Sequence, residues 1–342
     1  MKAVTFERFG GPEVLVHGER AAPAPEAGEA LVRVRACGVN HLDLWVRAGL
    51  PGLEPEMPHV LGNDVVGEVV ALGAGVRHLS LGQRTLVNPT LSCGVCPACA
   101  AGDDNLCRAY DVLGRRRNGG YAELVTVPAV NCLPYPENLS WEEAAAVPLV
   151  FTTAWHMLVT RARVRPGEDV LVIGAGSGVG SAAVQIARLH GARVIATAGS
   201  AAKLERARAL GAHETIDHSS EDVSARARAL TGKKGVDVVV EHVGGRVFEA
   251  AVSSLARDGR LVTCGATIGG KVTLDVNLLF GRHLALLGSW MGRRSDLNDA
   301  LRHVASGELE PVVDSALPLA DARRAHERLE ARQVFGKLVL VP

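Results

Sequence analysis

The feature that most constrains the fold is a glycine-rich turn near the middle of the chain. An apolar run at 170–173 is typical of a buried strand, glycines follow at 174, 176, 178 and 180, and residues 179–190 have the pattern of an amphipathic helix. Strand, glycine turn and helix in this order can hold a pyrophosphate at the helix N-terminus, because glycine lets the backbone approach closely. We therefore predict a dinucleotide site at Gly174, Gly176, Ser177, Gly178, Val179 and Gly180.

The residues around this turn alternate between strand and helix patterns. Strands are expected at 170–173, 193–197, 236–240, 259–264 and 284–288, and helices at 179–190, 201–210, 221–230 and 247–256. Such alternation indicates a parallel sheet covered on both faces, so we predict a doubly wound α/β domain over 151–289. Residues 1–90 have strand patterns separated by proline-containing loops, and a further strand is expected at 119–127. Residues 290–342 contain one helical stretch (319–331) and a final strand (337–341).

Composition narrows the class of protein. A chain of 342 residues can form about two domains. Lys+Arg and Asp+Glu are both 37, which argues against binding to nucleic acid or to an anionic membrane. The first residues carry no signal-peptide pattern, and no apolar run is long enough to span a membrane, so a cytoplasmic protein is expected.

The second predicted strand of the nucleotide domain bears on the choice of cofactor. In nucleotide folds an acidic residue at the end of this strand binds the ribose hydroxyls of NAD. Here the corresponding position is about Ala198, and no acidic residue lies near it in the strand. Ser200 can donate to a 2′-phosphate and Lys203 can supply a counter-charge, although a lysine here is also an ordinary exposed helix residue. The pattern favours NADPH over NADH.

A cysteine-dense loop lies at 91–108. Cys93, Cys96, Cys99 and Cys107 have the spacing C-x2-C-x2-C-x7-C, and four thiolates this close can surround one zinc ion tetrahedrally. Because all four positions would be filled by protein, such a zinc stabilises structure and does no chemistry. Two disulfides or an iron–sulfur cluster remain alternatives. Cys37, Cys132 and Cys264 are expected to be packing thiols.

Together these motifs resemble the medium-chain dehydrogenase/reductase superfamily, which contains zinc-type alcohol dehydrogenases and quinone oxidoreductases. The resemblance rests on residues 37–43 and 60–67, the cysteine loop, the glycine turn, residues 235–244 and 259–265, and the closing strand from Gly336. It implies a Rossmann NAD(P)-binding domain (151–289) inserted in a β-rich GroES-like catalytic domain (1–150 and 290–342). It also implies a homodimer or homotetramer.

The resemblance fails where zinc alcohol dehydrogenases hold a second, catalytic zinc. The three ligand positions of that zinc correspond to Asn40, Asn63 and Leu149, and the proton-relaying hydroxyl corresponds to Leu42. Amides are poor zinc ligands and leucine is not one, so we predict no normal catalytic zinc. An unusual site assembled from His41, His59, Asp43 and Asp64 remains an alternative. Asn40 following Val39 resembles the zinc-free quinone oxidoreductases instead.

Without a Lewis acid, hydrogen-bond donors must meet the charge that develops on a substrate oxygen. The candidate catalytic residues are Asn40 and Asn63 as donors, with Asp64 and Asp43 orienting them. By resemblance, His41 and Lys337 are expected to contact cofactor phosphates, and Thr153 is expected to pack against the nicotinamide. Hydride addition to a quinone, an enone or a related carbonyl tolerates the missing metal best, so the prediction is an NADPH-dependent reductase of such small molecules.

Two other functions are left open by the sequence. One is an NAD(P)-dependent alcohol or aldehyde dehydrogenase with an atypical pocket. The other is a non-enzymatic NADPH-binding protein.

Overall fold

The computed structural model describes all 342 residues, and the chain forms two compact units. The first unit contains both ends of the chain, Met1–Leu149 and Arg293–Pro342, and the second contains Val150–Gly292. Each unit has its own main sheet and its own cluster of buried apolar side chains. No helix is both long enough and apolar enough to cross a membrane.

The second unit is built on a six-stranded parallel sheet with the order β13-β12-β11-β14-β15-β16. Its strands are β11 (Asp169–Val172), β12 (Arg193–Ala198), β13 (Glu214–Asp217), β14 (Val236–Glu241), β15 (Leu255–Thr263) and β16 (Ala285–Gly288). Residues 170–172 of β11 are completely buried, as a central strand covered on both faces should be. The strand order reverses direction at β11, next to β14, and ligands of such sheets bind at this reversal.

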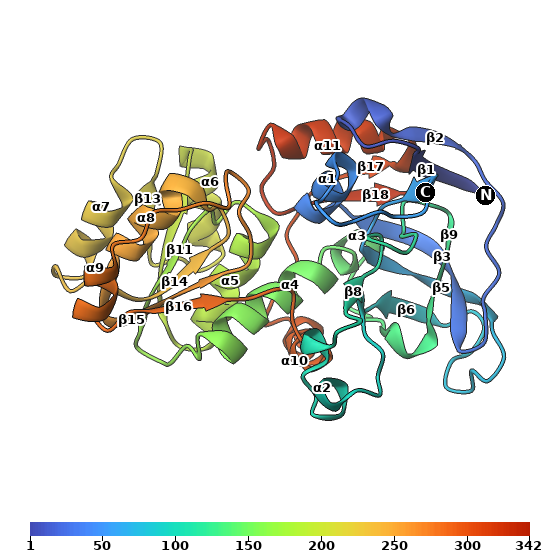
Figure 1. The fold of residues 1–342 in the computed structure, drawn as a ribbon, viewed down its shortest axis with the longest axis horizontal. Helices are drawn as coiled ribbons and strands as arrows, with labels where there is room; N and C mark the ends of the chain where they lie inside the picture. Colours follow the sequence, from blue (N-terminus) through green and yellow to red (C-terminus); the bar gives the residue numbers. More distant parts are fainter. The chain divides into compact units, whose positions relative to one another are not determined.

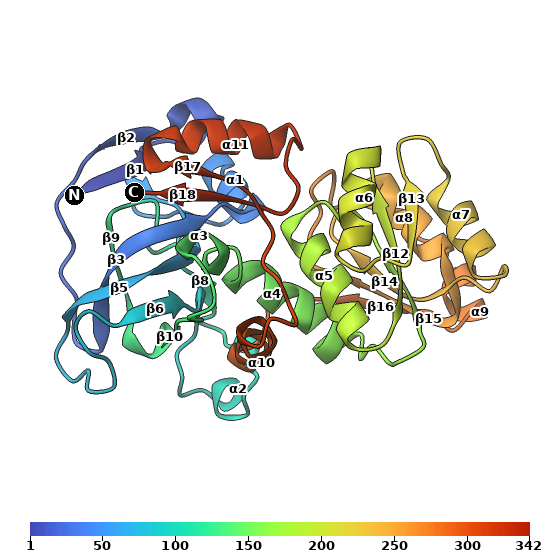
Figure 2. The same ribbon diagram turned by 180° about the vertical axis from the view of Figure 1, so that it is seen from behind.

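Helices cover both faces of this sheet (Figures 1 and 2). They are α5 (Gly178–Leu189), α6 (Ala201–Ala209), α7 (Val223–Leu230), α8 (Gly245–Ser253) and α9 (Val276–Gly281). The connections through α5 and α6 run toward β13, whereas those through α8 and α9 run toward β16. Because such crossovers are right-handed, the two pairs lie on opposite faces. The sequence is therefore correct in predicting a doubly wound α/β fold.

Sequence reasoning missed several elements of this unit, among them the helical stretch Pro148–Trp155 and the π-helix His156–Arg161 that continues it. Strand β13 is short and carries Glu214, Thr215 and Asp217, so it lacks the apolar run by which the other strands were recognised. Helix α9 is short and mostly exposed. Strand β15 begins at Leu255, four residues before the predicted start, because the chain passes through Asp258 in a left-handed conformation (φ +61°) and continues in the sheet.

The first unit is β-rich. Its strands are β1 (Lys2–Phe6), β2 (Val16–Glu19), β3 (Glu29–Gly38), β4 (His59–Val60), β5 (Asp64–Leu72), β6 (Arg84–Val87), β7 (Thr90–Leu91), β8 (Asp111–Val112), β9 (Leu124–Pro128), β10 (Cys132–Pro134), β17 (Val313–Pro318) and β18 (Lys337–Val341). Its helices are α1 (His41–Ala48), α2 (Pro97–Ala100), α3 (Trp141–Ala144), α10 (Arg294–Ala305) and α11 (Ala322–Glu330). Helix α4 (Pro148–Trp155) spans the boundary between the units.

The large sheet of this unit joins segments from both chain ends (Figure 1). Its order is β10-β6-β5-β3-β18-β17, and β9 also pairs with β3. Strands β5 and β18 both run antiparallel to β3, with Gly38 opposite Asp64 on one side and Val339 on the other. The end of β3 and the beginnings of β5 and β18 therefore meet at one edge of the sheet.

The C-terminal segment differs in part from the prediction. The final strand has the predicted bounds, and α11 begins at Ala322, after a short 3₁₀ turn at Leu319–Asp321. Helix α10 and strand β17 were not predicted. Strand β17 is partly exposed and mixes polar with apolar residues (burial varies along Val313–Pro318), which gives a weak strand pattern.

Candidate active site and metal centre

A buried polar cluster lies at the edge where β3, β5 and β18 meet. Asn40 follows β3 and precedes α1, Asn63 and Asp64 lie at the start of β5, and Lys337 is the first residue of β18. Their exposed fractions are 5%, 0%, 0% and 3%. Polar groups this deeply buried must satisfy one another by hydrogen bonds, and here they do.

Lys337 supplies the positive charge of this cluster. Its Nζ donates to the Val39 carbonyl (2.8 Å), Asn40 Oδ1 (2.6 Å) and Asp64 Oδ2 (2.8 Å). An ammonium has three N–H groups, so all of them are engaged inside the unit. The expectation that Lys337 contacts a cofactor phosphate stays a prediction. In the structure its side chain is turned into the sheet edge and paired with the buried Asp64 carboxylate.

Lys337 also fixes the orientation of the Asn40 amide. Because an ammonium cannot accept a hydrogen bond, the Asn40 atom that faces it must be the oxygen. The Asn40 nitrogen then donates to Asp64 Oδ2 at 2.9 Å, and it lies 3.4 Å from Asn63 Oδ1, which is long for a hydrogen bond. One N–H of Asn40 is thus firmly held and the other only weakly.

Asp64 and Asn63 are anchored from other elements as well. The backbone N–H of Leu149 donates to Asp64 Oδ1 (2.7 Å), so both carboxylate oxygens are engaged. Asn63 Nδ2 donates to the Leu113 carbonyl (2.5 Å). The structure therefore brings Asn40, Asn63 and Asp64 together, as the sequence suggested, and adds Lys337 as the cation among them.

Asp43 lies in the first turn of α1 and links the two asparagine-bearing segments. Its Oδ2 accepts from the Asn40 backbone N–H (2.8 Å) and its Oδ1 from that of Gly62 (3.0 Å). Gly62 has φ +104°, and a Cβ there would lie 2.6 Å from the Tyr121 ring, so only glycine fits this turn. Burial raises the pKa of the Asp43 carboxyl to about 7, although these N–H groups and Lys337 act in the opposite direction.

The structure does not support the alternative metal site from His41, His59, Asp43 and Asp64. His59 points elsewhere, with Nε2 3.1 Å from the Gly114 carbonyl and its ring against Phe6. His41 begins α1, with its ring 6.3 Å from that of Trp45. The only group of three or more metal-ligand side chains within mutual reach in the chain is the four cysteines.

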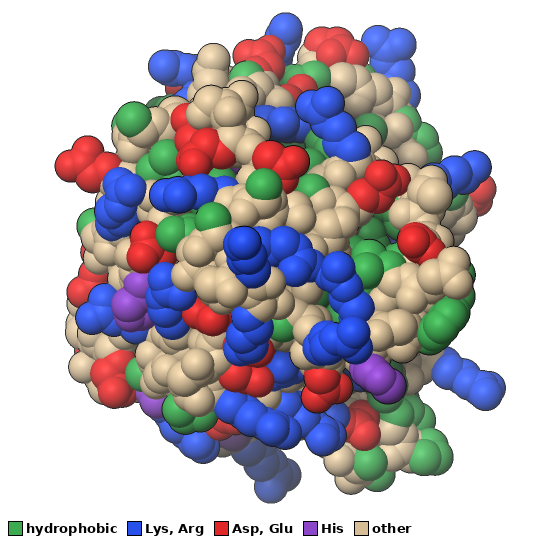
Figure 3. All heavy atoms as spheres, turned by 90° about the vertical axis from the view of Figure 1, so that its left-hand side faces the viewer, with side chains coloured by type: hydrophobic (Ala, Val, Ile, Leu, Met, Phe, Trp, Pro, Cys, Tyr) green, Lys and Arg blue, Asp and Glu red, His purple; other side chains and the backbone are tan.

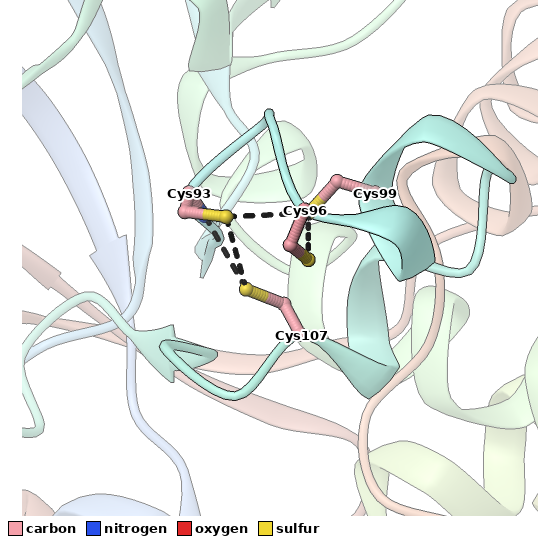
Figure 4. Close-up of side chains that lie close together, drawn as sticks. All are labelled: Cys93, Cys96, Cys99 and Cys107. Atoms are coloured by element: carbon pink, nitrogen blue, oxygen red, sulfur yellow. Dashed lines mark hydrogen bonds between the residues drawn. The ribbon is translucent and has the colours of Figure 1, made fainter.

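Those four cysteines form the second candidate site (Figure 4). Their Sγ atoms all lie within 4.8 Å of one another, with separations of 3.5 Å (Cys93–Cys107), 3.6 Å (Cys96–Cys99) and 3.9 Å (Cys93–Cys99). Four sulfurs at 2.3 Å from a tetrahedral zinc would be about 3.8 Å apart. Hydrogen bonds from the backbone of Val95 and Cys96 lower the pKa of Cys93 to about 6, which favours the thiolate that a metal needs.

The glycine turn lies at the start of α5, beside the point where the strand order reverses. Ser177 caps the helix by accepting from the Gly180 N–H (2.9 Å), and its Oγ lies 3.2 Å from His242 Nε2. A Cβ on Gly180 would lie 2.3 Å from the Gly174 carbonyl, so the turn can only close this tightly with glycine. Val179 sits in the first turn of α5, where backbone N–H groups point outward.

Strand β12 ends at Ala198, the position at which a ribose-binding residue is expected in nucleotide folds. Ser200 caps α6 by accepting from the Lys203 N–H (3.4 Å). On the neighbouring strand β13, Asp217 is the residue opposite Ala198. Its carboxylate already accepts hydrogen bonds from the backbone N–H and the hydroxyl of Ser219. His218, which sequence reasoning missed, lies beside Gly199, where a Cβ would be 2.9 Å from its Nε2. Thr153, on α4, is buried with Oγ1 3.8 Å from the Met291 sulfur.

Comparison with known proteins agrees with this architecture. Residues 26–137 match the family model for the alcohol dehydrogenase GroES-like domain, and residues 178–306 match that for zinc-binding dehydrogenases. The chain is 34% identical to an NAD-dependent alcohol dehydrogenase of Sulfolobus acidocaldarius (99% of each chain). It is 30% identical to a quinone oxidoreductase of Rattus norvegicus (100% of this chain, 98% of the relative). A crystal structure of an NAD-dependent alcohol dehydrogenase is 50% identical, with a TM-score of 0.97 and complete coverage of both chains.

The fold and these similarities define an NAD(P)-dependent oxidoreductase. The chain belongs to the medium-chain dehydrogenase/reductase superfamily, as its sequence motifs suggested.

Proposed function

We propose that this enzyme transfers hydride from NADPH to the conjugated system of a quinone, an enone or a related small carbonyl compound. The observation that carries the proposal is the cation in the polar cluster. Asp64 and Asn40 face the ammonium of Lys337, and Leu149 contributes only a backbone N–H. Two amides, a paired carboxylate and a leucine do not fit a catalytic zinc, so the substrate must react without a Lewis acid.

This pocket suits an acceptor that is already activated. A bound nicotinamide would supply the hydride, and addition to a conjugated acceptor would spread the resulting charge away from the attacked carbon. A simple ketone would need several kcal/mol of polarisation that a metal usually provides. Asn40 is the donor best placed to meet the charge on the acceptor oxygen, because its second N–H is held only by the long contact to Asn63. Asn63 and Asp64 then keep the Asn40 amide in place.

The proposal includes one structural zinc in the cysteine lobe, defined as residues 91–108. The four thiol groups have separations suited to tetrahedral coordination, and protein ligands fill the whole shell. Such an ion would hold β7, α2 and β8 together and would have no open position for a substrate.

NADPH is the proposed cofactor because the end of β12 offers donors in place of an acid. Ser200 is exposed at the helix start, Lys203 follows on α6, and His218 packs beside Gly199. Hydroxyl, ammonium and imidazole groups can all donate to a 2′-phosphate, whereas the Asp217 carboxylate is already bound by Ser219.

Self-association as a homodimer or homotetramer is also proposed. Strand β16 is at one edge of its sheet, and the adjoining α9 exposes Val276 (60%) and Phe280 (66%). Exposed large apolar side chains beside an unpaired strand edge favour contact with a second copy. Elsewhere on this unit, Lys and Arg side chains are interspersed with Asp and Glu (Figure 3). Light scattering would give the oligomeric state.

The competing function is NAD-dependent alcohol oxidation, after which the 50% identical structure is named. The test is a steady-state panel in both directions: NADPH or NADH with quinones and enones, and NAD⁺ or NADP⁺ with alcohols, together with the zinc content. Reduction of conjugated acceptors by NADPH with one zinc per chain is expected. Faster alcohol oxidation, or a second zinc whose removal stops turnover, would overturn the proposal.

The role of Asn40 is tested with Asn40→Ala in the same assay. Loss of a donor to the developing oxyanion should lower kcat by about 10²-fold. Asn118→Ala is a control, because Asn118 is an exposed asparagine of the same unit whose side chain accepts only from the Val60 backbone N–H. If the two substitutions lowered kcat equally, Asn40 would have no specific role in the reaction.

A further inference from the structure

A chain of buried side chains runs from the surface of α11 to Asp43. Arg47 Nη2 donates to Glu330 (2.5 Å), and Arg47 Nη1 lies 2.9 Å from His326 Nδ1. His326 Nε2 lies 3.1 Å from the Tyr121 hydroxyl, which is 3.2 Å from Asp43 Oδ2. His326, Tyr121 and Asp43 are 0% exposed and Arg47 is 2% exposed, so water does not interrupt the chain.

The direction of these hydrogen bonds follows from Arg47. A guanidinium can only donate, so Nδ1 of His326 must accept and its proton must be on Nε2. Nε2–H then donates to the Tyr121 oxygen, and the Tyr121 hydroxyl donates to Asp43. Burial lowers the pKa of His326 to about 3, with Arg47 acting in the same sense, so the imidazole is neutral at ordinary pH.

This direction matters for the ionisation of Asp43. If Asp43 were protonated and donated to Tyr121, the tyrosine oxygen would receive two hydrogen bonds and its own proton would lose its acceptor. The relay therefore favours the carboxylate form, which can accept from Tyr121, Asn40 and Gly62 together.

Other charged and titratable groups also face Asp43. Lys337 on β18 favours the carboxylate, whereas Asp64 on β5 and burial disfavour it. The Cys37 thiol on β3 is a further neighbour, and burial together with Asp43 raises its pKa well above the ordinary value, so this thiol carries no charge. Because the pKa of Asp43 is about 7, its protonated and ionised forms are both populated at neutral pH. The gain or loss of one hydrogen-bond donor can therefore change which form predominates.

We propose that Arg47, His326 and Tyr121 form a relay that keeps Asp43 as an acceptor and so holds the Asn40 and Asn63 segments in their working positions. Tyr121 and His326 are positioning residues, since they act through Asp43. The proposal rests on the proposed function only in assigning the chemistry to Asn40. The relay itself can be tested with whichever reaction the enzyme performs.

The first test is the pH dependence of kcat for Tyr121→Phe, with Tyr135→Phe as the matched control. Tyr135 is buried in the same unit and donates to the Leu139 carbonyl, away from Asp43. In the wild type, kcat should fall as pH drops through about 7, where Asp43 becomes protonated. Loss of the Tyr121 donor should shift this midpoint upward by about one pH unit, with the KM of the nucleotide unchanged.

Two substitutions of His326 separate the effect of losing its hydrogen bonds from the effect of altered packing. Gln can accept from Arg47 and donate to Tyr121, so His326→Gln should restore a wild-type profile, whereas His326→Leu should reproduce that of Tyr121→Phe. A Tyr121→Phe profile that coincides with those of the wild type and Tyr135→Phe would overturn the relay.

A readout without turnover separates this proposal from the proposed function. Infrared spectroscopy can follow the carbonyl stretch of protonated Asp43, assigned by its absence in Asp43→Asn. The band should appear at higher pH in Tyr121→Phe than in the wild type. If the pH midpoint of this band is the same in Tyr121→Phe and the wild type, the relay is wrong, even if the enzyme reduces enones. If the midpoint shifts, the relay is supported, even if the substrate is an alcohol.

Discussion

The cysteine lobe and the polar cluster handle charge in opposite ways. The lobe brings four thiols within 4.8 Å of one another, and we propose that a zinc ion from outside balances their charge. The polar cluster has Asp64 as its anion and Lys337 as its cation, held at 2.8 Å. On this proposal the first region is completed by a ligand, whereas the second is complete when the chain folds.

The sharpest test of this contrast is removal of one thiolate from the lobe. Cys96→Ser should abolish zinc binding and destabilise the first unit by several kcal/mol, because structural zinc contributes its binding energy to folding. Zinc content by mass spectrometry and thermal unfolding would measure this. The control is Cys132→Ala, a buried cysteine outside the lobe, which should retain one zinc per chain. Full zinc occupancy in Cys96→Ser would contradict the assignment.

The reciprocal test removes the cation from the polar cluster. Lys337→Met leaves the Asp64 carboxylate buried without its charge partner and should cost about 3–5 kcal/mol. Adding Asp64→Asn should recover much of this loss, since no charge then remains to be paired. Urea unfolding of both variants, with Lys271→Met as an exposed lysine control, would measure the effect. If Lys337→Met alone were as stable as the wild type, the Lys337–Asp64 ion pair would not be needed for stability.

The same contrast explains what the sequence could predict. The four cysteines lie within 15 residues, so their spacing alone indicated a metal site. Asp64 and Lys337 are separated by 273 positions, and they meet only because β18 pairs with β3. Lys337 was recognised from the closing motif, but its partner was not, because a motif does not show which way a side chain turns.

The relay was beyond sequence reasoning for a similar reason. Tyr121 and His326 are 205 positions apart, and neither lies in a pattern that marks a site. The alternating strands and helices around the glycine turn, by contrast, are local patterns, and most of the strands and helices of the second unit were predicted from them. Short polar strands such as β13 were not predicted, since their burial depends on the neighbouring elements rather than on their own composition.

A third prediction concerns how the relay behind the polar cluster responds to pH. His326 has a pKa of about 3 in the folded chain and about 6.5 when unfolded. A lowered folded pKa gives stability that is present above pH 6.5 and is lost as pH falls. Between pH 7 and 5 the wild type should therefore lose about 2 kcal/mol relative to His326→Gln. The difference is measured by urea unfolding at both pH values.

Asp43 does not obscure this comparison. Its raised pKa makes stability fall as pH rises toward 7, opposite in sign to His326, but the contribution is common to the wild type and to a Gln variant that keeps the relay. His17→Gln, an exposed substitution, should show no such pH-dependent gain. A constant difference between His326→Gln and the wild type over this range would mean that the buried imidazole is not held neutral.

The last prediction concerns the end of β12, where we propose that a phosphate supplies a charge from outside, as zinc does in the cysteine lobe. Ser200→Asp should shift the preference from NADPH toward NADH by about 10- to 100-fold in kcat/KM, because a carboxylate repels the 2′-phosphate. Aspartate is as good a helix cap as serine, so α6 should be unaffected. Ser200→Ala loses the cap without adding charge, and the ratio of the two nucleotides should change less. If Ser200→Asp left that ratio unchanged, the phosphate would not lie at this helix start, and the comparison between ligand-completed and self-completed sites would apply to the first unit alone.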